Sequence, residues 1–425
     1  MTIRNRLLAG AALALCLQAA PAILSAADLT LVEVITSPER TEVLEGLVSA
    51  WEEETGNTVE IVSLPWGQAF ETLATMVAGG DVPDVVEMPE RWMALYSGAG
   101  QLTDLGPYVA EWEDGATLTE QTVTSGSMTA SGKLEMIPYG FYLRAMFYNK
   151  DLLEQAGVAE PPRTMEEFVA AANAVSQLEG KSGYCLRGGP GSTGGWLMFA
   201  AAMNDTDQFF DENGQSTLNQ PGAVQGLQTM IDLYTSGAAP RDSVNWGFNE
   251  IVAGFYSGTC AFLDQDPDAL IGIQDRMDPE SFAVVPMPVG PGGRAFPTIG
   301  YAGWSIFSTT ESPDEAWSLV AHLSSPESNS TWAQRVGVIP IHQGADQAPF
   351  FQTEQFAGWF EELNDPETFV PLRAPFELEG YGFFADQLSI ETGQQALLGE
   401  ITAQELGDQW AEYLTEERAK FVANQ

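Results

Sequence analysis

Hydrophobic and polar residues follow one another along the chain in segments that predict alternating strands and helices. Residues 29–34 read Leu-Thr-Leu-Val-Glu-Val, a run typical of a buried strand. Residues 41–54 then place apolar side chains at helical spacing, before a strand over 59–64, a helix over 67–78 and a strand over 84–87. This order predicts a parallel sheet covered by helices, with a ligand site beyond the carboxyl ends of its strands.

The alternation begins again in the middle of the chain. Thr164 and Glu167 have the spacing of a capping box, which predicts the start of a helix that runs to Ser176. The later elements that we expect are strands over 184–186, 258–263 and 301–307, a hairpin connection over 286–293, and helices over 221–234, after Ser312, after Pro326 and after Thr402. Because no linker rich in proline, serine or like charges divides the two α/β regions, we expect the chain to cross between them more than once.

The charge of the chain excludes two classes of partner. The sequence has 17 lysines and arginines against 59 aspartates and glutamates, a formal net charge of −42 at pH 7. Nucleic acids and anionic membrane surfaces are bound through clusters of lysine and arginine, which this composition lacks. We interpret the acidic excess as a solvated surface, and we expect neither nucleic acid nor membrane as a partner.

The amino-terminal segment has the pattern of a signal peptide. Arg4 and Arg6 precede an apolar run over 7–17, and Ser25-Ala26-Ala27 supplies the small residues of a cleavage site. The apolar run is shorter than the roughly 20 residues that span a bilayer, so a membrane anchor is disfavoured. We therefore expect residues 1–27 to be removed on export to the periplasm.

Cys185 and Cys260 are the cysteines that remain beyond this leader. In an oxidising compartment they can form a disulfide, which would stabilise the chain by roughly 4 kcal/mol in the chain-entropy description. Two buried free thiols are the alternative, and the sequence leaves both open.

Two motifs bear on chemistry. Residues 189–194 match G-x-G-x-x-G, but a proline stands between the first two glycines, and we favour a ligand-facing loop with the hydroxyls of Ser192 and Thr193 over a nucleotide site. His322 and His342 are the two histidines, so no catalytic triad or zinc site is assembled, and we expect neither a metal nor a cofactor. Asp264, Asp266 and Asp268 follow a predicted strand, and such paired carboxylates are the basis of an alternative, a secreted carbohydrate-active enzyme.

Tryptophan is a further signal, because aromatic rings stack on the C–H faces of sugars. Trp66, Trp92, Trp196, Trp246 and Trp304 fall in or beside the loops at the strand ends. For these five the sequence leaves ligand contact and core packing open.

Several motifs resemble those of one family of binding proteins. They occupy residues 54–66, 78–86, 98–102, 132–138, 148–153 and 337–340, in the family's order. On these motifs the chain resembles extracellular solute-binding protein family 1, the maltose-binding-protein-like sugar-binding proteins of ABC importers.

The resemblance implies the type II periplasmic binding protein fold, an α/β fold of two lobes that each contain a mixed, mostly parallel sheet flanked by helices. Three hinge crossovers are expected near residues 140–144, 300–304 and 345–350. The lobes that follow are residues 28–141 plus 304–347 and residues 145–300 plus 350–425, with the ligand cleft between them.

The family resemblance and the strand-end positions together give the candidate ligand-binding residues. They are Ser37, Glu39, Arg40, Trp66, Glu90, Arg91, Trp92, Tyr142, Arg144, Ser192, Thr193, Trp196, Trp246, Asp264, Asp266, Trp304, Arg373 and Tyr381. The chain departs from the maltose-binding pattern where Asp268 replaces an aromatic residue, which argues against maltodextrin itself.

The function implied is capture of a mono- or oligosaccharide, or a related polyol or sugar acid, by closure of the lobes. The loaded protein, which we expect to be a monomer, would deliver the ligand to the transmembrane permease of an ABC transporter with a separate ATPase. It would catalyse no reaction.

Export makes a prediction that protein chemistry can check. Sequencing the amino terminus of the exported protein should find Asp28 first, because cleavage after Ala27 satisfies the small-residue rule. A mature protein that begins at Met1, or that carries a lipid on Cys16, would contradict this prediction; the bulky Leu15 argues against the lipid.

Overall fold

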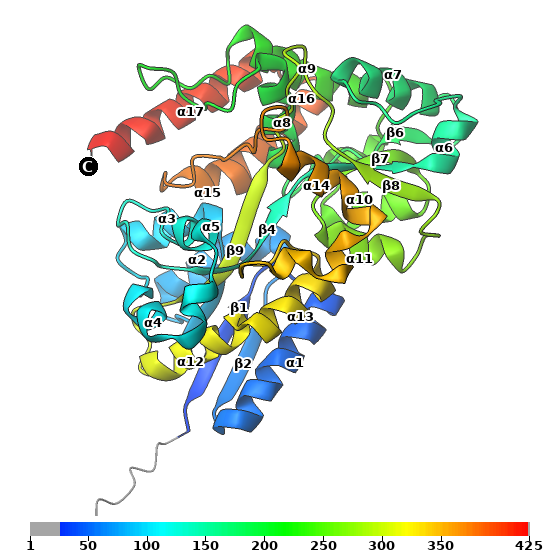
Figure 1. Ribbon diagram of the computed structural model, residues 1–425. Helices are drawn as coiled ribbons and strands as arrows, with labels where there is room; N and C mark the ends of the chain where they lie inside the picture. The colour runs from blue at the N-terminus through cyan, green and yellow to red at the C-terminus, as the bar shows by residue number, and fades with distance from the viewer. Residues whose placement is uncertain (1–25, 424–425) are drawn as a thin grey trace, which may run out of the picture.

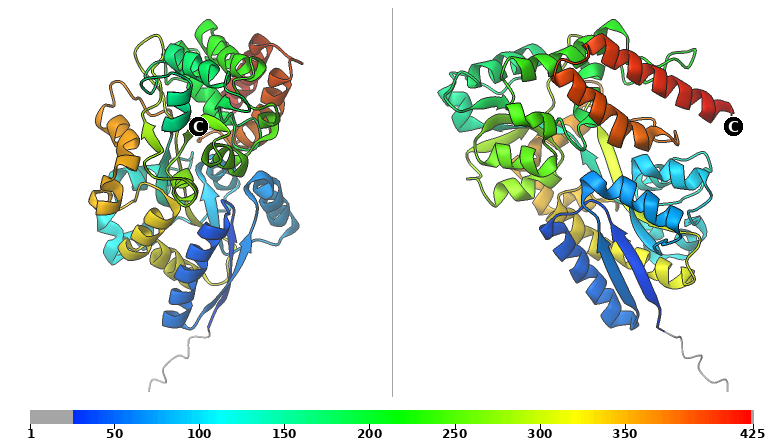
Figure 2. Two further views of the ribbon diagram at one scale, coloured as in Figure 1. Left: turned by 90° about the vertical axis from the view of Figure 1, so that its right-hand side faces the viewer. Right: turned by 180° about the vertical axis from the view of Figure 1, so that it is seen from behind.

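The computed structural model describes residues 26–423 of the chain, except for the side chains of residues 346 and 354 (Figure 1). The predicted signal peptide over 1–27 lies almost wholly outside the described residues. Figures 1 and 2 show two lobes, each built around one sheet. Within residues 26–423, no helix combines the length and the apolar character that crossing a membrane requires.

The first lobe contains a five-stranded mixed sheet. In spatial order its strands are β2 (Thr58–Ser63), β1 (Asp28–Glu33), β3 (Val85–Pro89), β9 (Ile299–Ile306) and β4 (Ile137–Leu143). The strands β1, β2 and β3 pair in parallel, as the alternation of the sequence predicts, whereas β9 is antiparallel to both of its neighbours. The chain enters β9 from the other lobe. β9 therefore runs in the opposite direction to β1, β2 and β3, whose carboxyl ends point toward that lobe.

The second lobe repeats this arrangement with four strands. They are, in spatial order, β6 (Ser182–Tyr184), β7 (Cys260–Gln265), β5 (Ala145–Asn149) and β8 (Phe282–Val285). Here β5 is the entering strand, antiparallel to β7 and β8, while β6 and β7 are parallel. Apart from the entering strand, each sheet therefore presents carboxyl ends to the space between the lobes.

Helices flank both sheets, which confirms the predicted fold class. The first lobe contains α1 (Pro38–Thr55), α2 (Trp66–Gly79), α3 (Glu90–Gly98), α4 (Gly106–Glu111), α5 (Glu120–Gly126), α12 (Pro313–Ser324) and α13 (Pro326–Val336). The second contains α6 (Lys150–Gln155), α7 (Met165–Val175), α8 (Thr193–Asn204), α9 (Pro221–Thr235), α10 (Phe248–Tyr256), α11 (Asp268–Gln274), α14 (Ala357–Asn364), α15 (Tyr381–Phe383), α16 (Ser389–Leu397) and α17 (Ala403–Ala423). The capping box of Thr164 and Glu167 is present, and Thr402 and Glu405 exchange the same pair of bonds.

The chain passes between the sheets at short segments. Arg144 stands alone between β4 and β5, within the crossover expected over 140–144. The chain returns before Ile299, where β9 starts, slightly earlier than the expected 300–304. The third expected crossover, over 345–350, contains the short 3₁₀ turns η3 (Ala345–Gln347) and η4 (Pro349–Gln352).

Two local expectations were wrong. Residues 286–293 do not join a hairpin, because β8 before them and β9 after them lie in different sheets. The strand expected over 184–186 is β6, which ends at Tyr184, since it pairs with β7 only through Ser182 and Tyr184. Both errors arise because partner choice between strands is a long-range property that local pattern does not contain.

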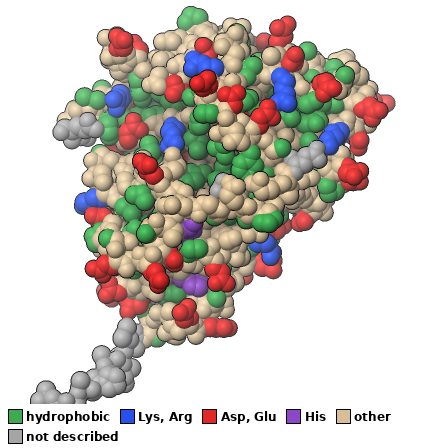
Figure 3. Space-filling model, viewed as in Figure 1, with side chains coloured by type: hydrophobic (Ala, Val, Ile, Leu, Met, Phe, Trp, Pro, Cys, Tyr) green, Lys and Arg blue, Asp and Glu red, His purple; other side chains and the backbone are tan. Residues whose placement is uncertain are grey.

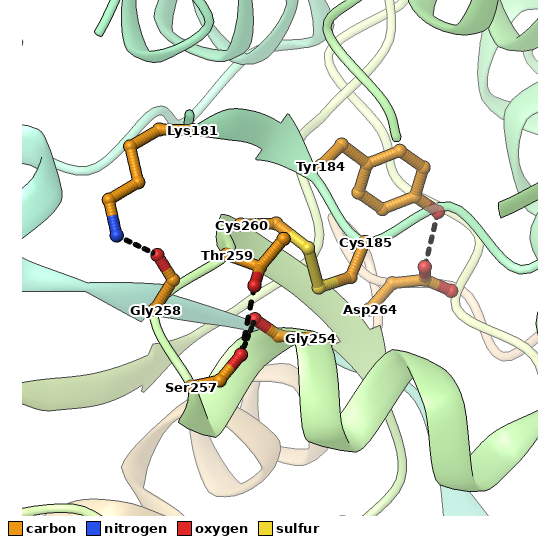
Figure 4. The surroundings of a disulfide bond; sticks show 9 residues. All are labelled: Lys181, Tyr184, Cys185, Gly254, Ser257, Gly258, Thr259, Cys260 and Asp264. Carbon is orange, nitrogen blue, oxygen red and sulfur yellow. Dashed lines mark hydrogen bonds between the residues drawn. A yellow bond between two sulfur atoms is a disulfide. The ribbon is translucent and has the colours of Figure 1, made fainter. Parts of the chain in front are cut away.

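A disulfide joins Cys185 and Cys260 in the second lobe (Figure 4). Cys185 directly follows β6 and Cys260 begins the neighbouring strand β7, so strand pairing brings their Cα atoms to 5.5 Å. Both cysteines are fully buried. A Cβ at Gly254 would lie 3.0 Å from Sγ of Cys185, so α10 can pack on the disulfide because residue 254 is glycine. The structure thus decides a pairing that the sequence left open.

Removing this disulfide should destabilise the protein. The cysteines are 75 residues apart, and in the chain-entropy description the double variant C185A/C260A loses roughly 4 kcal/mol of unfolding free energy. Denaturant unfolding without reductant measures this loss, and dithiothreitol should weaken the wild type while leaving the variant unchanged. Two free thiols in the unreduced, denatured mature chain would contradict the pairing.

Candidate functional site

A cavity of about 830 Å³ lies between the two sheets, where the carboxyl ends of their strands face one another. Residues 35–40 after β1, Pro65 and Trp66 after β2, and Glu90 and Arg91 after β3 line it from the first lobe. The second lobe lines it with residues after β6 and at the end of β7, namely Arg187, Pro190, Gly191, Thr193, Gly194, Gln265, Asp266, Asp268 and Ala269. The strand ends therefore form the walls, as the sequence predicts.

Most of the candidate residues reach this cavity. Those that line it are Ser37, Glu39, Arg40, Trp66, Glu90, Arg91, Tyr142, Arg144, Thr193, Asp266 and Tyr381. Those that do not are Trp92, Ser192, Trp196, Trp246, Asp264, Trp304 and Arg373.

Two of the tryptophans outside the cavity lie in the cores of the lobes. Trp196 on α8 is fully buried and its ring meets that of Trp410 edge-on at 6.2 Å. Trp304 on β9 packs against Tyr139 and Trp332 in the first lobe. Both were candidate ligand-binding residues, but the structure places them in the core, because an indole on the inner face of a helix or strand gains more by burial than by exposure at a strand end.

The other five residues outside the cavity lie behind or beside its walls. Trp92 stacks on Trp66 and donates from Nε1 to Asp386 at 2.6 Å. Asp264 is buried beneath the wall, where it holds Arg144. Ser192 is buried, and its Oγ lacks a partner among the described residues. Trp246 packs toward Gly254 and the disulfide. Arg373 is exposed and donates a hydrogen bond to Gln121.

A buried ion pair shapes the first-lobe wall. Nη2 of Arg40 lies 2.8 Å from Oε1 of Glu87, and Tyr139 donates to the same oxygen at 2.6 Å. The second oxygen of Glu87 accepts the backbone N–H groups of Val34 and Ile35, both at 2.8 Å. The carboxylate of β3 thus fixes the turn after β1, and it positions Arg40 at the cavity surface.

The phenol of Tyr142 extends this network toward the second lobe. Its oxygen lies 2.9 Å from that of Tyr139, and Nη1 of Arg40 donates to it at 3.4 Å. Tyr142 belongs to β4 and lies two residues before Arg144, where the chain crosses between the lobes. Tyr142 therefore lines the cavity beside this crossover.

A second buried ion pair shapes the opposite wall. Nη1 of Arg144 lies 2.7 Å from Oδ2 of Asp264, and Nε lies 3.7 Å from Oδ1 of Asp266. Tyr184 donates to the other oxygen of Asp264 (Figure 4). Burial, with a smaller contribution from the charge of Asp266, raises the pKa of Asp268 to about 7. Asp266 and Asp268 therefore line this wall beside the guanidinium of Arg144, which Asp264 holds from behind.

A third arginine lies where the two lobes meet. Arg91 lies 3.1 Å from Glu90 and 3.5 Å from Asp386, which follows α15 of the second lobe. Its guanidinium is also 5.4 Å from the ring centre of Trp66. Trp66 is half-buried and stacks on Trp92 with ring centres 5.5 Å apart, so its indole is held rigidly at the cavity surface.

Several lining residues were not anticipated. Arg187 is the most notable, and others are Phe209, Asn245, Tyr256 and Phe376. Arg187 comes three residues after the last residue of β6 and directly before the glycine-rich loop, a strand-end position that the sequence rule could have identified. The others come from helices and connections whose direction toward the cavity is set by tertiary packing.

The cavity differs in charge from the rest of the molecule. Acidic side chains are scattered over the face shown in Figure 3, in keeping with the net charge of −42. By contrast, six arginines line the cavity, namely Arg40, Arg91, Arg144, Arg187, Arg276 and Arg335. The sequence contains 13 arginines, of which 11 lie in residues 26–423, so more than half of those described lie at this one site. Within the same residues, no cluster of His, Cys, Asp and Glu is arranged to hold a metal ion.

Comparisons with known proteins agree in naming one family. The family described as "Bacterial extracellular solute-binding protein" matches residues 37–330. An ABC transporter-binding protein of Deinococcus radiodurans is 29% identical over 306 residues, which cover 68% of this chain and 70% of that protein. A maltooligosaccharide ABC transporter solute-binding lipoprotein of Streptococcus pneumoniae is 22% identical over 315 residues, which cover 71% and 70%.

Solved structures show the same similarity in three dimensions. Maltose-bound MalE3 of T. maritima matches with a TM-score of 0.80 at 25% identity, over 92% of this chain and 99% of that one. A solute-binding protein of Thermotoga lettingae with bound α-D-tagatose matches with a TM-score of 0.81 at 20% identity, over 92% and 100%. The second similarity supports the fold alone.

One buried carboxyl beside the first-lobe network makes the stability of the fold depend on pH. Glu33, the last residue of β1, accepts bonds from Thr41 and Ser63 through Oε2, while its buried Oε1 has no partner among the described residues. Burial, assisted by the charge of Glu87, raises the pKa of Glu33 from 4.5 to about 7.

Between these two values the folded protein holds a proton that the unfolded chain has lost, so stability falls as the pH rises through this window. The variant E33Q removes this titration. Denaturant unfolding from pH 4.5 to 8 should show the wild type losing up to about 3 kcal/mol relative to E33Q, with no further change above pH 7. A difference between the two proteins that stays constant with pH would contradict the assignment.

Proposed function

Because the chain belongs to the bacterial extracellular solute-binding protein family, whose members serve ABC transporters, we propose that it captures a sugar in the cavity between its lobes. The ligand class is a mono- or oligosaccharide, or a related polyol or sugar acid. The loaded protein then delivers this ligand, in the periplasm, to the transmembrane permease of an ABC transporter that has a separate ATPase. The family consists of binding proteins of transporters and not of enzymes.

The observation that carries this proposal is the composition of the cavity walls. A half-buried indole, that of Trp66, stands beside fixed hydrogen-bonding groups from both lobes, among them Arg40, Tyr142, Arg144 and Asp266. Sugars present apolar C–H faces and a ring of hydroxyl groups, and they need both kinds of contact. The volume of about 830 Å³ lies within the range of small-molecule sites and accommodates a mono- or oligosaccharide.

Relatives support the same ligand class. The proteins named above include one with bound maltose and one described as a maltooligosaccharide solute-binding lipoprotein. A periplasmic protein of Pectobacterium atrosepticum that is 23% identical is described as binding sn-glycerol-3-phosphate, a phosphorylated polyol. These names extend from neutral sugars to charged polyols, and all are polyhydroxylated molecules.

We propose closure of the lobes as the means of capture. Residues 28–141 plus 304–347 would form one lobe and residues 145–300 plus 350–425 the other. A ligand that contacts Trp66 and Arg40 in one lobe and Asp266 in the other is fully engaged only when the lobes are together, so it stabilises the closed state. The geometry supports this because the chain crosses at segments as short as the single residue Arg144.

The enzyme alternative loses one of its three candidate residues. Asp264 is bound by Arg144 and by Tyr184, and it lies behind the cavity wall. Asp266 and Asp268 still line the cavity, so the family of binding proteins argues against this alternative, and a search for reaction products tests it.

A thermal-shift screen tests the proposal. Neutral sugars, polyols, sugar acids and sugar phosphates are added singly, and a ligand at about one hundred times its Kd stabilises the protein by about 2.7 kcal/mol. The same mixtures are analysed for products after prolonged incubation. Stabilisation without turnover supports a binding protein, whereas turnover, or no shift with any member of the panel, would refute it.

Replacing the indole that lines the cavity tests the site itself. Trp66→Ala should weaken binding of the best sugar in the screen by about 1–3 kcal/mol, because a stacking surface is lost from a desolvated pocket. Isothermal titration measures the affinity, and circular dichroism confirms folding. The matched control is Trp112→Ala, which should bind like the wild type. Trp112 is also half-buried, but it does not line the cavity. Equal losses in both variants would count against Trp66 as a ligand contact.

A further inference from the structure

Arg187 is held at the cavity wall by the loop that follows it. Its Nε donates to the carbonyl oxygen of Pro190 at 2.6 Å. Gly191 has a φ of +82°, and a Cβ built there would stand 2.2 Å from Nη2 of Arg187, so the guanidinium lies directly against this glycine. The side chain is only 8% exposed and it lines the cavity. The glycine-rich loop therefore presents one guanidinium in a fixed position.

The charge of Arg187 is not matched by an acid. Arg40, Arg91 and Arg144 each have a carboxylate oxygen within 3.1 Å. Among residues 26–423 with described side chains, none offers Arg187 an ion pair within 4.0 Å, and neither Nη1 nor Nη2 makes a hydrogen bond there. Burial, together with the charge of Arg144, lowers the pKa of Arg187 to about 9. Buried charges in proteins are paired. The guanidinium of Arg187 therefore needs a counter-charge that the described residues do not supply.

The surroundings of Arg187 favour an anion. α8 begins at Thr193 and runs for 12 residues, and Gly191, Thr193 and Gly194 at its amino-terminal end line the cavity beside the guanidinium. The amino-terminal end of a helix carries partial positive charge and unbonded N–H groups. The acids whose charges act on Arg187 are Asp266 and Asp268, from the segment after β7, and Arg144 lies 3.7 Å from Asp266.

We propose that Arg187 binds an oxyanion carried by the ligand, a carboxylate or a phosphate, and that the protein therefore prefers acidic sugars to their neutral counterparts. The inference rests on the proposed function and narrows its ligand class. A neutral sugar leaves the buried guanidinium without a counter-charge, whereas an oxyanion accepts two parallel N–H bonds from Nη1 and Nη2. The fixed position of the guanidinium means that little side-chain freedom is lost on binding.

Matched sugar pairs test the preference. Isothermal titration compares D-glucose with D-glucuronate and D-glucose 6-phosphate, and D-galactose with D-galacturonate and D-galactose 6-phosphate, together with any sugar that shifts the melting temperature in the screen. The acidic member of at least one set should bind the wild type at least tenfold more tightly than the neutral member. Comparing the sugar acids with the sugar phosphates shows whether a carboxylate or a phosphate is the preferred group.

The variant R187Q should abolish this preference. The affinity of the acidic sugar should fall at least tenfold, while that of the neutral sugar stays within about threefold of the wild type. R163Q loses the same charge at an exposed ion pair with Glu361 and should retain the preference. If R187Q does not fold, R187K serves, because it keeps the charge without the planar fork and should lower the acid preference partially.

Three outcomes are decisive. Equal or tighter binding of the neutral member in every set would overturn the inference, and so would an acid preference that survives in R187Q. If no sugar binds, neutral or acidic, the proposed function itself fails. Neutral binding with no acid preference leaves the proposed function standing and removes only the role of Arg187.

Discussion

The requirement that a buried charge be paired governs the organisation of the cavity walls. Taking a guanidinium or a carboxylate out of water is costly unless an opposite charge and hydrogen bonds replace the water. Arg40 and Glu87 meet this requirement in the first lobe, and Arg144 and Asp264 meet it in the second. Each pair connects elements that are distant in sequence, so the same contacts that neutralise the charges also fix the loops at the strand ends.

The direction of the strands explains why these charges meet. In each sheet, the strands other than the entering strand point toward the other lobe, so the polar residues that follow them collect at one place. The entering strands β5 and β9 run the opposite way and add Arg144 and Gly300 from their amino-terminal ends. The shared direction of the strands therefore places a polar wall on each lobe, and the short crossovers keep the two walls facing one another.

The acidic composition of the chain does not predict the charges of the residues that line the cavity. Acidic side chains are scattered over the face shown in Figure 3, in keeping with the net charge of −42, whereas the cavity gathers six of the 11 described arginines. Charges at short range in a cavity of low dielectric outweigh distant surface charges that salt screens. The electrostatics that a ligand meets are consequently those of Arg40, Arg91, Arg144 and Arg187 with their partners, and a highly acidic protein can hold an anionic ligand.

The sequence by itself determined the α/β order of elements and the strand ends beside which Arg40, Trp66 and Arg91 lie, because helix and strand periodicity and strand-end positions are local properties. Its motifs carried the resemblance to the family. Only the tertiary structure decided which tryptophan faces the cavity. Trp66 and Trp196 both lie in the first turn of a helix that follows a strand, yet the first lines the cavity and the second is buried against Trp410. It also decided the pairing of Cys185 with Cys260, the separation of β8 from β9, and the lack of an ion pair within 4.0 Å between Arg187 and any described acid. Each of these depends on which distant residues pack together, and contacts of that kind leave no period or spacing in the sequence.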